Sequence, residues 1–486
     1  MFPKILILIS FLFLVFILII IIRTIRFKPK KEVHNLVLKK ELELSDIEKE
    51  QAVNTLKEMI ICKTVSSINE EEEYYNEFEK FEKTLKNSFP IIYEKCEFKK
   101  LGKKSLLFKL NGSNKEAKNI VLMAHYDVVP VNEEDWEKPA FEGILENDVL
   151  WGRGTLDTKG TLNGIMNALN KLLKEGFVPN NNIYLAFAGD EEVNGTGAPV
   201  IVEYFKENNV EIHMVLDEGG AVVDNVFPKV TKHCAVVGIA EKGMLNVKLS
   251  VKSNGGHAST PKPNGSIARL SKAVLKIEKS PFSQVLTIPT LELFNKLGRH
   301  SSFVYRMIFA NLWLFKGVLN FICKKSGGEL NAISRTTTAF TQMNGSTAIN
   351  VLPPEASVCI NLRLITGETQ ESALEKIRKI VDDDKVEVTR ISGFNPTDIS
   401  EINCEQFSMI EKAISETWDN TIVTPYLMLA CSDSRHYNDI SKNVYRFSAM
   451  HLSKEERGLI HGNNERIPVE TITKVVEFYI RLIKSC

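Results

Sequence analysis

The sequence predicts an α/β protein with a second, smaller α/β unit inserted in it and an apolar helix at its N-terminus. Short apolar runs alternate with helix-like stretches after residue 46, a pattern typical of a sheet with helices on both faces. A separate pattern of strand, helix, two strands, helix and strand occupies residues 242–393. With 486 residues, the chain is long enough for two domains and additional segments.

Composition excludes some classes of function. Lys plus Arg and Asp plus Glu both total 61, so no bulk charge attracts nucleic acid, and we expect no nucleic-acid partner. The eight cysteines are scattered and form no CxxC pair, so they define neither a zinc knuckle nor a disulfide framework.

The N-terminal run from Ile5 to Ile22 approaches the ~20 apolar residues that span a bilayer and exceeds the core of a signal peptide. No small-residue cleavage site follows, so we expect a transmembrane anchor at 1–23 and a charged linker at 24–45. Basic residues after the run favour a cytoplasmic body by the positive-inside rule. Four glycosylation sequons favour a lumenal or extracellular body instead: Asn111, Asn194, Asn264 and Asn344. We expect a lumenal or extracellular body, secreted if the N-terminal segment is cleaved.

A main α/β domain is expected in two segments, 46–241 and 394–486. Its first helix begins at Ser45, with Asp46 and Glu48 in the first turn. A further helix is expected from about Lys159 to Glu175. Strand-like apolar runs lie near Ile91 to Tyr93, Ser105 to Leu110, Ile120 to Ala124, Ile183 to Phe187 and Met214 to Leu216.

Candidate metal ligands follow these strands. His125 ends one strand, and Asp127, two residues on, shares its face and can orient the imidazole ring. Carboxyl ends of strands in such sheets collect ligands. Further candidates are Asp157 in WGRGTLDTKG, Glu191 and Glu192 in GDEEV, Asp217 in LDEGG, and His461 in HGNNE.

Two histidines and three carboxylates form a set suited to two Zn²⁺ ions with one bridging carboxylate. Glu191 and Glu192 are adjacent and diverge after their strand, so one can bind metal while the other takes a proton from water. A single acid of this kind is usually only a solvated loop residue. The whole set favours a metal centre.

The smaller unit is expected at 242–393. Its elements are strands at Gly243 to Val251, Arg335 to Thr341, Ala356 to Ile365 and Lys385 to Ile391, with helices at Ser266 to Ile277 and Gln370 to Val381. An apolar insertion at 280–330 interrupts it. This insertion could form packed helices, a dimer contact, or a wall for a long acyl chain, where each buried CH₂ contributes about 0.8 kcal/mol.

The combined motifs HYDVVP, WGRGTLDTKG, GDEEV, LDEGG, SNGGHASTP, SDSRHY and HGNNERI resemble the di-zinc aminoacylase and carboxypeptidase family of metallopeptidases. The similarity is greatest to its N-fatty-acyl-amino acid synthase/hydrolase and vacuolar carboxypeptidase S branches. The resemblance implies a mixed-sheet, zinc-exopeptidase-like catalytic domain with a lid of the dimerisation type, and a possible homodimer through that lid. It also implies two Zn²⁺ ions, held by His125, Asp157, Glu192, Asp217 and His461.

The resemblance implies roles for other residues as well. Asp157 bridges the metals, Asp127 orients His125, and Glu191 is the general base and later proton donor. His257, in GGHAS, stabilises the oxyanion, and Arg363, in INLRL, clamps the substrate carboxylate together with Asn350. Ser432 begins a substrate-facing loop, although Cys431 and Ser432 stand where Gly and Thr are expected, and Ala449 stands where Pro is expected.

We therefore expect a zinc-dependent amide hydrolase acting reversibly on N-acyl amino acids. A carboxypeptidase that cleaves short peptides is the first alternative, and a non-catalytic, membrane-anchored scaffold is the second. Loss of a ligand or of Glu191 would favour the scaffold, but every expected position carries a suitable residue.

Overall fold

The computed structural model describes residues 2–29, 42–69, 71, 73–224 and 230–486. Residues 30–41 of the expected linker lie outside the described residues. A mixed, eight-stranded sheet in the order β1-β2-β6-β3-β7-β16-β8-β15 forms the centre of the main domain. Its strands are β1 (Glu97–Leu101), β2 (Ser105–Leu110), β3 (Asn119–His125), β6 (Asn182–Ala188), β7 (Met214–Val223), β8 (Cys234–Glu241), β15 (Ile422–Met428) and β16 (Val444–Leu452).

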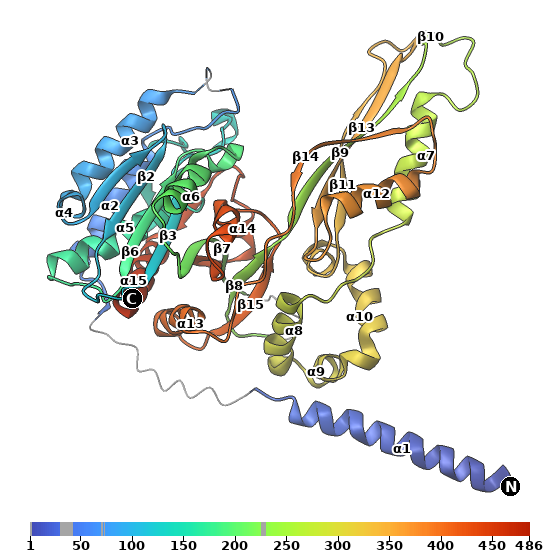
Figure 1. Ribbon diagram of the computed structural model, residues 1–486, viewed down its shortest axis with the longest axis horizontal. Coiled ribbons are helices and arrows are strands. Elements are labelled where there is room, and N and C mark those ends of the chain that lie inside the picture. The colour runs from blue at the N-terminus through green and yellow to red at the C-terminus, as the bar shows by residue number, and fades with distance from the viewer. Residues whose placement is uncertain (1, 30–41, 70, 72, 225–229) are drawn as a thin grey trace.

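Helices cover both faces of this sheet, as expected (Figure 1). Because side chains alternate along a strand, Leu122 of β3 packs into one core, whereas Val121 and Met123 pack into the other. The first core contains α2 (Asp46–Ile60), α5 (Lys159–Lys174) and α15 (Val469–Ser485), and the second contains α6 (Gly197–Glu207). β3, β6, β7 and β16 run parallel, so their carboxyl ends meet at one edge.

Local signals explain the helix boundaries. Ser45 caps α2 in a capping box with Glu48, as its sequence predicts. The strand expected at Ile91 to Tyr93 is wrong, because these residues lie in helix α4 (Pro90–Lys95). Pro90 occupies the first helical turn, where its fixed φ favours a helix, and a three-residue apolar run does not distinguish the two structures.

The remaining elements of the main domain are short or peripheral. The helices are α3 (Tyr75–Ser88), α13 (Glu405–Thr417) and α14 (Lys454–Arg457), with 3-10 turns η3 (Glu133–Asp135), η4 (Glu191–Val193) and η5 (Asp433–Asp439). A small sheet, β17-β5-β4, pairs β4 (Ile144–Glu146), β5 (Val149–Trp151) and β17 (Arg466–Pro468). This small sheet joins the Gly-rich turn after Trp151 to the segment that carries His461.

The smaller unit has a four-stranded antiparallel sheet and its own hydrophobic core. Its elements follow the expected order: β9 (Gly243–Lys252), α7 (Ser266–Lys279), β11 (Thr337–Asn344), β13 (Glu355–Leu364), α12 (Gln370–Val381) and β14 (Glu387–Phe394). A two-stranded ribbon of β10 (Gly256–His257) and β12 (Val351–Leu352) forms its tip. Figure 1 shows this tip at the end of the unit farthest from the main sheet.

The apolar insertion forms four helices beside the edge strand of the main sheet. They are α8 (Ile288–His300), α9 (Phe303–Ala310), α10 (Leu312–Ser326) and α11 (Gly328–Ala332). α8 packs on β15, and α9 contacts the N-terminal helix α1 (Phe2–Arg26). Within the described residues, Lys4–Arg26 is the single helix long and apolar enough to cross a membrane. These contacts favour helix packing, among the alternatives above, for the insertion.

Candidate metal centre

Asp157 lies between the two predicted histidine ligands. Its Oδ1 is 3.0 Å from His125 Nε2, and its Oδ2 is 2.9 Å from His461 Nε2. His125 ends β3, Asp157 directly precedes α5, and His461 follows β16 and α14. One carboxylate therefore faces two imidazoles from distant parts of the chain, as a bridging ligand requires.

Asp127 holds both His125 and the turn that carries the two glutamates. It is fully buried, and its Oδ1 lies 3.2 Å from His125 Nδ1. Its carboxylate also accepts hydrogen bonds from the backbone N–H of Glu191 and of Glu192, each at 3.1 Å, and from the Ser66 hydroxyl at 2.7 Å. Burial would raise the pKa of Asp127, but the hydrogen bond and charge of His125, together with the hydrogen bonds from Ser66 and Glu192, hold this pKa below its usual value. The orienting role expected for Asp127 therefore has a defined geometry.

Glu192 forms one group that could hold a metal with His125 and Asp157, whereas Glu191 belongs to another group with His125 and Glu218. Glu192 Oε2 is 3.0 Å from His461 Nε2. Side-chain hydrogen bonds with Asp157 and Glu192 raise the pKa of His461 to about 10. Burial raises the pKa of Glu191 well above its ordinary value, although the charge of His125 opposes this shift.

The choice of Asp217 as a ligand stays a prediction, and the neighbouring Glu218 is a second candidate. Glu218 Oε1 lies 3.4 Å from His125 Nε2, and Glu218, His125 and Glu191 form a second group that could hold a metal. Asp217 is buried and accepts a hydrogen bond from the backbone N–H of Ser434 at 3.0 Å. The register of β7 shifts between Asp217 and Gly220, so strand alternation does not decide which of the two acids in LDEGG faces the centre. The motif alone could not identify which one.

Glu465, which closes the HGNNE motif, has a structural role that the motif does not indicate. It is fully buried and forms an ion pair with Arg153 at 2.7 Å. Its carboxylate also accepts hydrogen bonds from the backbone N–H of Gly154 at 3.0 Å and of Leu156 at 2.7 Å. Glu465 therefore holds the Gly-rich turn that presents Asp157.

Ser432 does not face open space, contrary to its expected place in a substrate-facing loop. It is fully buried, and its hydroxyl donates to Glu241 Oε1 at 3.1 Å. Glu241 also forms a buried ion pair with Arg446 at 2.6 Å. The Ser432 hydroxyl therefore belongs to a buried polar network, with Glu241 and Arg446, that holds the 432–436 loop against the interior of the main domain.

The three other predicted residues belong to the smaller unit. Arg363, on β13, reaches the loop of the main domain, where its Nη1 lies 3.1 Å from Cys431 Sγ. His257 and Asn350 lie together at the tip, where the Ala258 N–H donates to the Asn350 carbonyl at 3.0 Å. Figure 1 shows β10, which carries His257, far from the main sheet. The structure thus brings Arg363 to the main domain but leaves His257 and Asn350 apart from the ligand groups.

The donor set fits divalent cations. Asp157, Glu191, Glu192 and Glu218 converge on only two imidazoles, and all four are largely buried. Burial of so much negative charge is unfavourable unless cations compensate it. Carboxylate and imidazole are ligands that suit zinc and related ions.

Comparison with known proteins agrees with this geometry. The model of peptidase family M20/M25/M40 matches residues 121–485. A probable carboxypeptidase S-like protein of Dictyostelium discoideum is 35% identical over 96% of this chain and 91% of its own length. An N-fatty-acyl-amino acid synthase/hydrolase of Xenopus tropicalis is 36% identical over 91% of this chain and 87% of its own length.

Among solved structures, an M20 family metallo-carboxypeptidase from Sulfolobus solfataricus has the same fold, with a TM-score of 0.62 and 18% identity. The alignment covers 90% of this chain and 99% of that one. The matched region contains every ligand candidate described above. The chain therefore belongs to peptidase family M20/M25/M40.

Proposed function

We propose that the protein is a di-zinc amide hydrolase that cleaves, and in reverse forms, N-acyl amino acids with long acyl chains. The observation that carries this proposal is the carboxylate of Asp157 between His125 and His461, with Glu191 near His125. His461, Asp157 and Glu192 would hold one Zn²⁺, and His125, Asp157 and Glu218 the other. The two ions would polarise the substrate carbonyl and lower the pKa of a water molecule.

Glu191 is the proton carrier in this scheme. A carboxylate whose pKa is raised by burial can take a proton from water and later donate it to the leaving amide nitrogen. Asp127 fixes the Glu191 backbone through its 3.1 Å hydrogen bond, so the base is held in position before the substrate arrives. The same groups serve condensation, because a catalyst accelerates both directions of a reaction.

Residues of the smaller unit bind the substrate. Arg363 offers a planar, two-pronged donor at the junction of the two units, which suits the carboxylate of an amino-acid product. His257 donates to the developing oxyanion once the tip of a lid approaches the centre, and Asn350 moves with it. That tip belongs to the same chain after closure of the lid, or to a second copy in a homodimer.

We favour a fatty-acyl substrate because the Xenopus tropicalis relative is an N-fatty-acyl-amino acid synthase/hydrolase. A carboxypeptidase acting on short peptides is the second candidate, since the Dictyostelium discoideum relative covers more of this chain. We place the body at a lumenal or extracellular membrane surface, held there by α1.

The test is hydrolysis of N-oleoyl-phenylalanine compared with a blocked dipeptide, using the detergent-solubilised, zinc-loaded chain. Faster release of phenylalanine from the oleoyl substrate supports the lipid-amide function, whereas faster dipeptide cleavage identifies a carboxypeptidase. Glu191→Gln should retain its zinc but lose about 10²- to 10⁴-fold in kcat, because it removes the proton carrier and keeps the ligands. Full activity in this variant would disprove the assignment of the base.

A further inference from the structure

The N-terminal helix docks on the corner between α9 and α10. The guanidinium group of Arg23 donates to the Ala310 carbonyl at 3.0 and 3.2 Å and to Asn311 Oδ1 at 3.1 Å. Asn311 is buried, and its amide donates to the Ile20 carbonyl at 3.4 Å and to the Thr24 hydroxyl at 3.3 Å. These polar contacts fix the end of α1 to the body.

A second contact lies deeper along α1. The rings of Phe16 and Trp313 meet edge to face, with centroids 6.0 Å apart. Phe16 precedes Arg23 by seven residues, which corresponds to about 10 Å along a helix. If α1 spans a bilayer, the start of α10 therefore reaches the depth at which interfacial helices lie, about 5 to 10 Å into the membrane.

The helices α9 and α10 expose an apolar surface beside α1. They meet at a bend of 117° and are together apolar enough to pass as a broken span or re-entrant segment. Trp313 is 59% exposed, Val304 60% and Phe321 65%, and Phe303, Leu314 and Val318 are exposed as well. Large apolar side chains grouped in this way mark a contact surface rather than a water-facing one.

The charge of residues 303–326 indicates which kind of partner contacts this apolar surface. Residues 303–326 contain four basic residues, Arg306, Lys316, Lys324 and Lys325, and no Asp or Glu. Aromatic, aliphatic and basic side chains without acids are the composition of helices that lie in the headgroup region of a membrane.

We propose that α9 and α10 insert into the same leaflet as the end of α1 and hold the body in a fixed orientation on the bilayer. α8 transmits this orientation, since it packs directly on β15 of the main sheet. This inference does not depend on the proposed substrate. A body held in this way would meet amphiphilic substrates that partition into the membrane.

Quenching by brominated lipid tests this proposal on the full chain in phosphatidylcholine vesicles. The chain has four tryptophans, and Trp136 and Trp418 are buried in the main domain. Brominated acyl chains should quench part of the fluorescence of the unaltered protein and of Trp418→Phe, but most of this quenching should disappear in Trp313→Phe. Phe321→Trp, added to Trp313→Phe, should restore it. Undiminished quenching in Trp313→Phe would overturn the proposal, as would an absence of quenching in the unaltered protein, which is expected if a second copy covers the surface.

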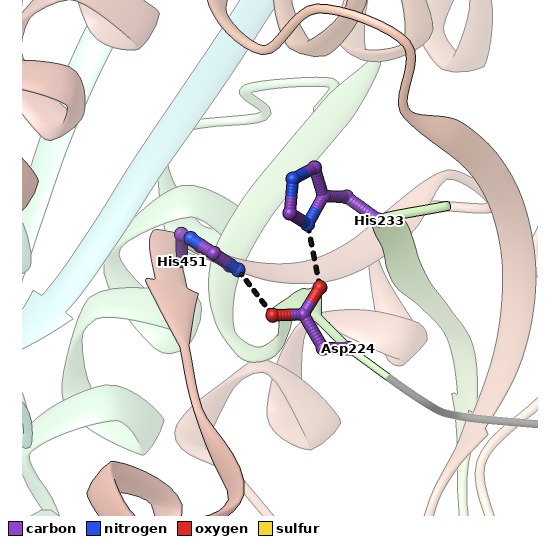
Figure 2. A group of neighbouring side chains, drawn as sticks. All are labelled: Asp224, His233 and His451. Atoms are coloured by element: carbon purple, nitrogen blue, oxygen red, sulfur yellow. Dashed lines mark hydrogen bonds and ion pairs between the residues drawn. The ribbon is translucent and has the colours of Figure 1, made fainter. Parts of the chain in front are cut away.

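A different cluster of metal-ligand side chains lies outside the catalytic centre (Figure 2). Asp224 follows β7, His233 precedes β8 and His451 lies on β16. Asp224 Oδ1 is 2.5 Å from His233 Nδ1, and Asp224 Oδ2 is 3.0 Å from His451 Nε2. One ligand atom from each residue lies within 4.8 Å of the others, and all three side chains are partly exposed to solvent.

We infer that this cluster is an additional site for a divalent transition-metal ion such as Zn²⁺, with water completing its coordination. Two imidazoles and one carboxylate suit such ions. The ion would join the ends of β7 and β16 to the start of β8.

Zinc stoichiometry of the full chain tests this inference. After equilibration with micromolar Zn²⁺, the unaltered protein should hold one equivalent more than His451→Gln or His233→Gln. His213→Gln, just before the opposite end of β7, serves as the control and should retain the additional equivalent. Equal zinc content in all four proteins would overturn the inference.

Discussion

His125 and His461 approach their carboxylate partners as closely as hydrogen-bonded pairs do, so each holds a proton when no metal is present. Asp157 and Glu192 raise the pKa of His461 to about 10. An imidazole must lose its proton at the coordinating nitrogen to bind zinc. Metal binding and proton release are therefore coupled at this residue.

This coupling predicts that zinc binding releases a proton from His461 at pH 7.5. Because the metal competes with this proton, zinc affinity should fall about tenfold for each unit by which pH decreases below the pKa. Calorimetry in two buffers of different ionisation enthalpy measures the number of protons released. His461→Gln should release one proton fewer, and an unchanged number would contradict the assignment.

The position of Glu218, 3.4 Å from His125, predicts different results for two neighbouring substitutions. Glu218→Gln should lose one of the two catalytic zinc ions, because it removes a charged ligand. Asp217→Asn should keep both, because the amide oxygen can still accept the hydrogen bond from Ser434. Metal analysis of the two purified variants measures their zinc content. Loss of one zinc ion from Asp217→Asn but not from Glu218→Gln would identify Asp217 as the ligand.

At the scale of single residues, strand ends and acidic motifs were sufficient to predict most of the cluster. His125, Asp157, Glu191, Glu192 and His461 come together as expected. The choice between Asp217 and Glu218 within LDEGG stays a prediction, because two adjacent acids have equal chemistry. The burial of Ser432 was not predictable either, since a hydroxyl in a loop carries no signal of its burial.

At the scale of elements, the Gly-rich turn depends on a residue more than 300 positions away in the chain. Glu465 receives two backbone N–H groups of this turn and pairs with Arg153. A buried ion pair that loses one partner leaves an uncompensated charge, which costs about 3 to 5 kcal/mol. Glu465 thus couples β17 to the position of Asp157.

Glu465→Gln should therefore lower the free energy of unfolding by about 3 to 5 kcal/mol and weaken zinc binding. Urea titration and metal analysis measure the two effects. The matched control is Glu329→Gln, because Glu329 forms an exposed ion pair with Arg457 at 3.2 Å, and exposed pairs contribute less than about 1 kcal/mol. Similar losses in both variants would contradict the role assigned to Glu465.

Among the elements, those with strong local signals were predictable. The helix expected at Gln370 to Val381 has the observed bounds, and α2 begins after its capping residue Ser45. The short run at Ile91 to Tyr93 failed because three apolar residues show no period. The pairing of β10 with β12 depends on contacts between residues almost 100 positions apart, which local patterns do not contain.

At the scale of the whole molecule, Lys242 lies where the main sheet, the insertion and the smaller unit meet. Its Nζ donates to the carbonyls of Ala332 at 3.0 Å and Arg335 at 2.8 Å. Burial, with a smaller contribution from the charge of Arg363, lowers the pKa of Lys242 to about 7. In the unfolded chain a lysine has a pKa of about 10.4, so the unfolded state binds more protons between these two values.

Lys242 should therefore make the protein more stable as pH rises from about 7 to about 10, by a few kcal/mol at most. Below pH 7 both states are protonated, and this contribution no longer changes with pH. Lys242→Met should flatten the rise in the free energy of unfolding, measured by urea titration at several pH values. Lys115→Met, at an exposed position, should keep the original slope. If the free energy of unfolding of Lys242→Met rises with pH as steeply as that of the unaltered protein, the carbonyls of Ala332 and Arg335 already compensate the buried charge of Lys242.

The arrangement of units was only partly predictable. The apolar insertion and the N-terminal helix were each visible in the sequence, but their contact depends on Arg23 and Asn311, two polar residues with no pattern in common. The distance of His257 from the metal centre was also not predictable. The GGHAS motif indicates the chemistry of its loop but not the position of the smaller unit relative to the main domain.

The order of strands in the main sheet also bears on how the protein is made. β16 lies between β7 and β8, although it is synthesised about 200 residues after them. His461 follows it, so a ribosome has already translated the smaller unit and the insertion before the last ligand emerges. A nascent or prematurely terminated chain therefore lacks both a central strand and a complete metal centre. We therefore expect truncated chains that end before His461 to lack hydrolytic activity.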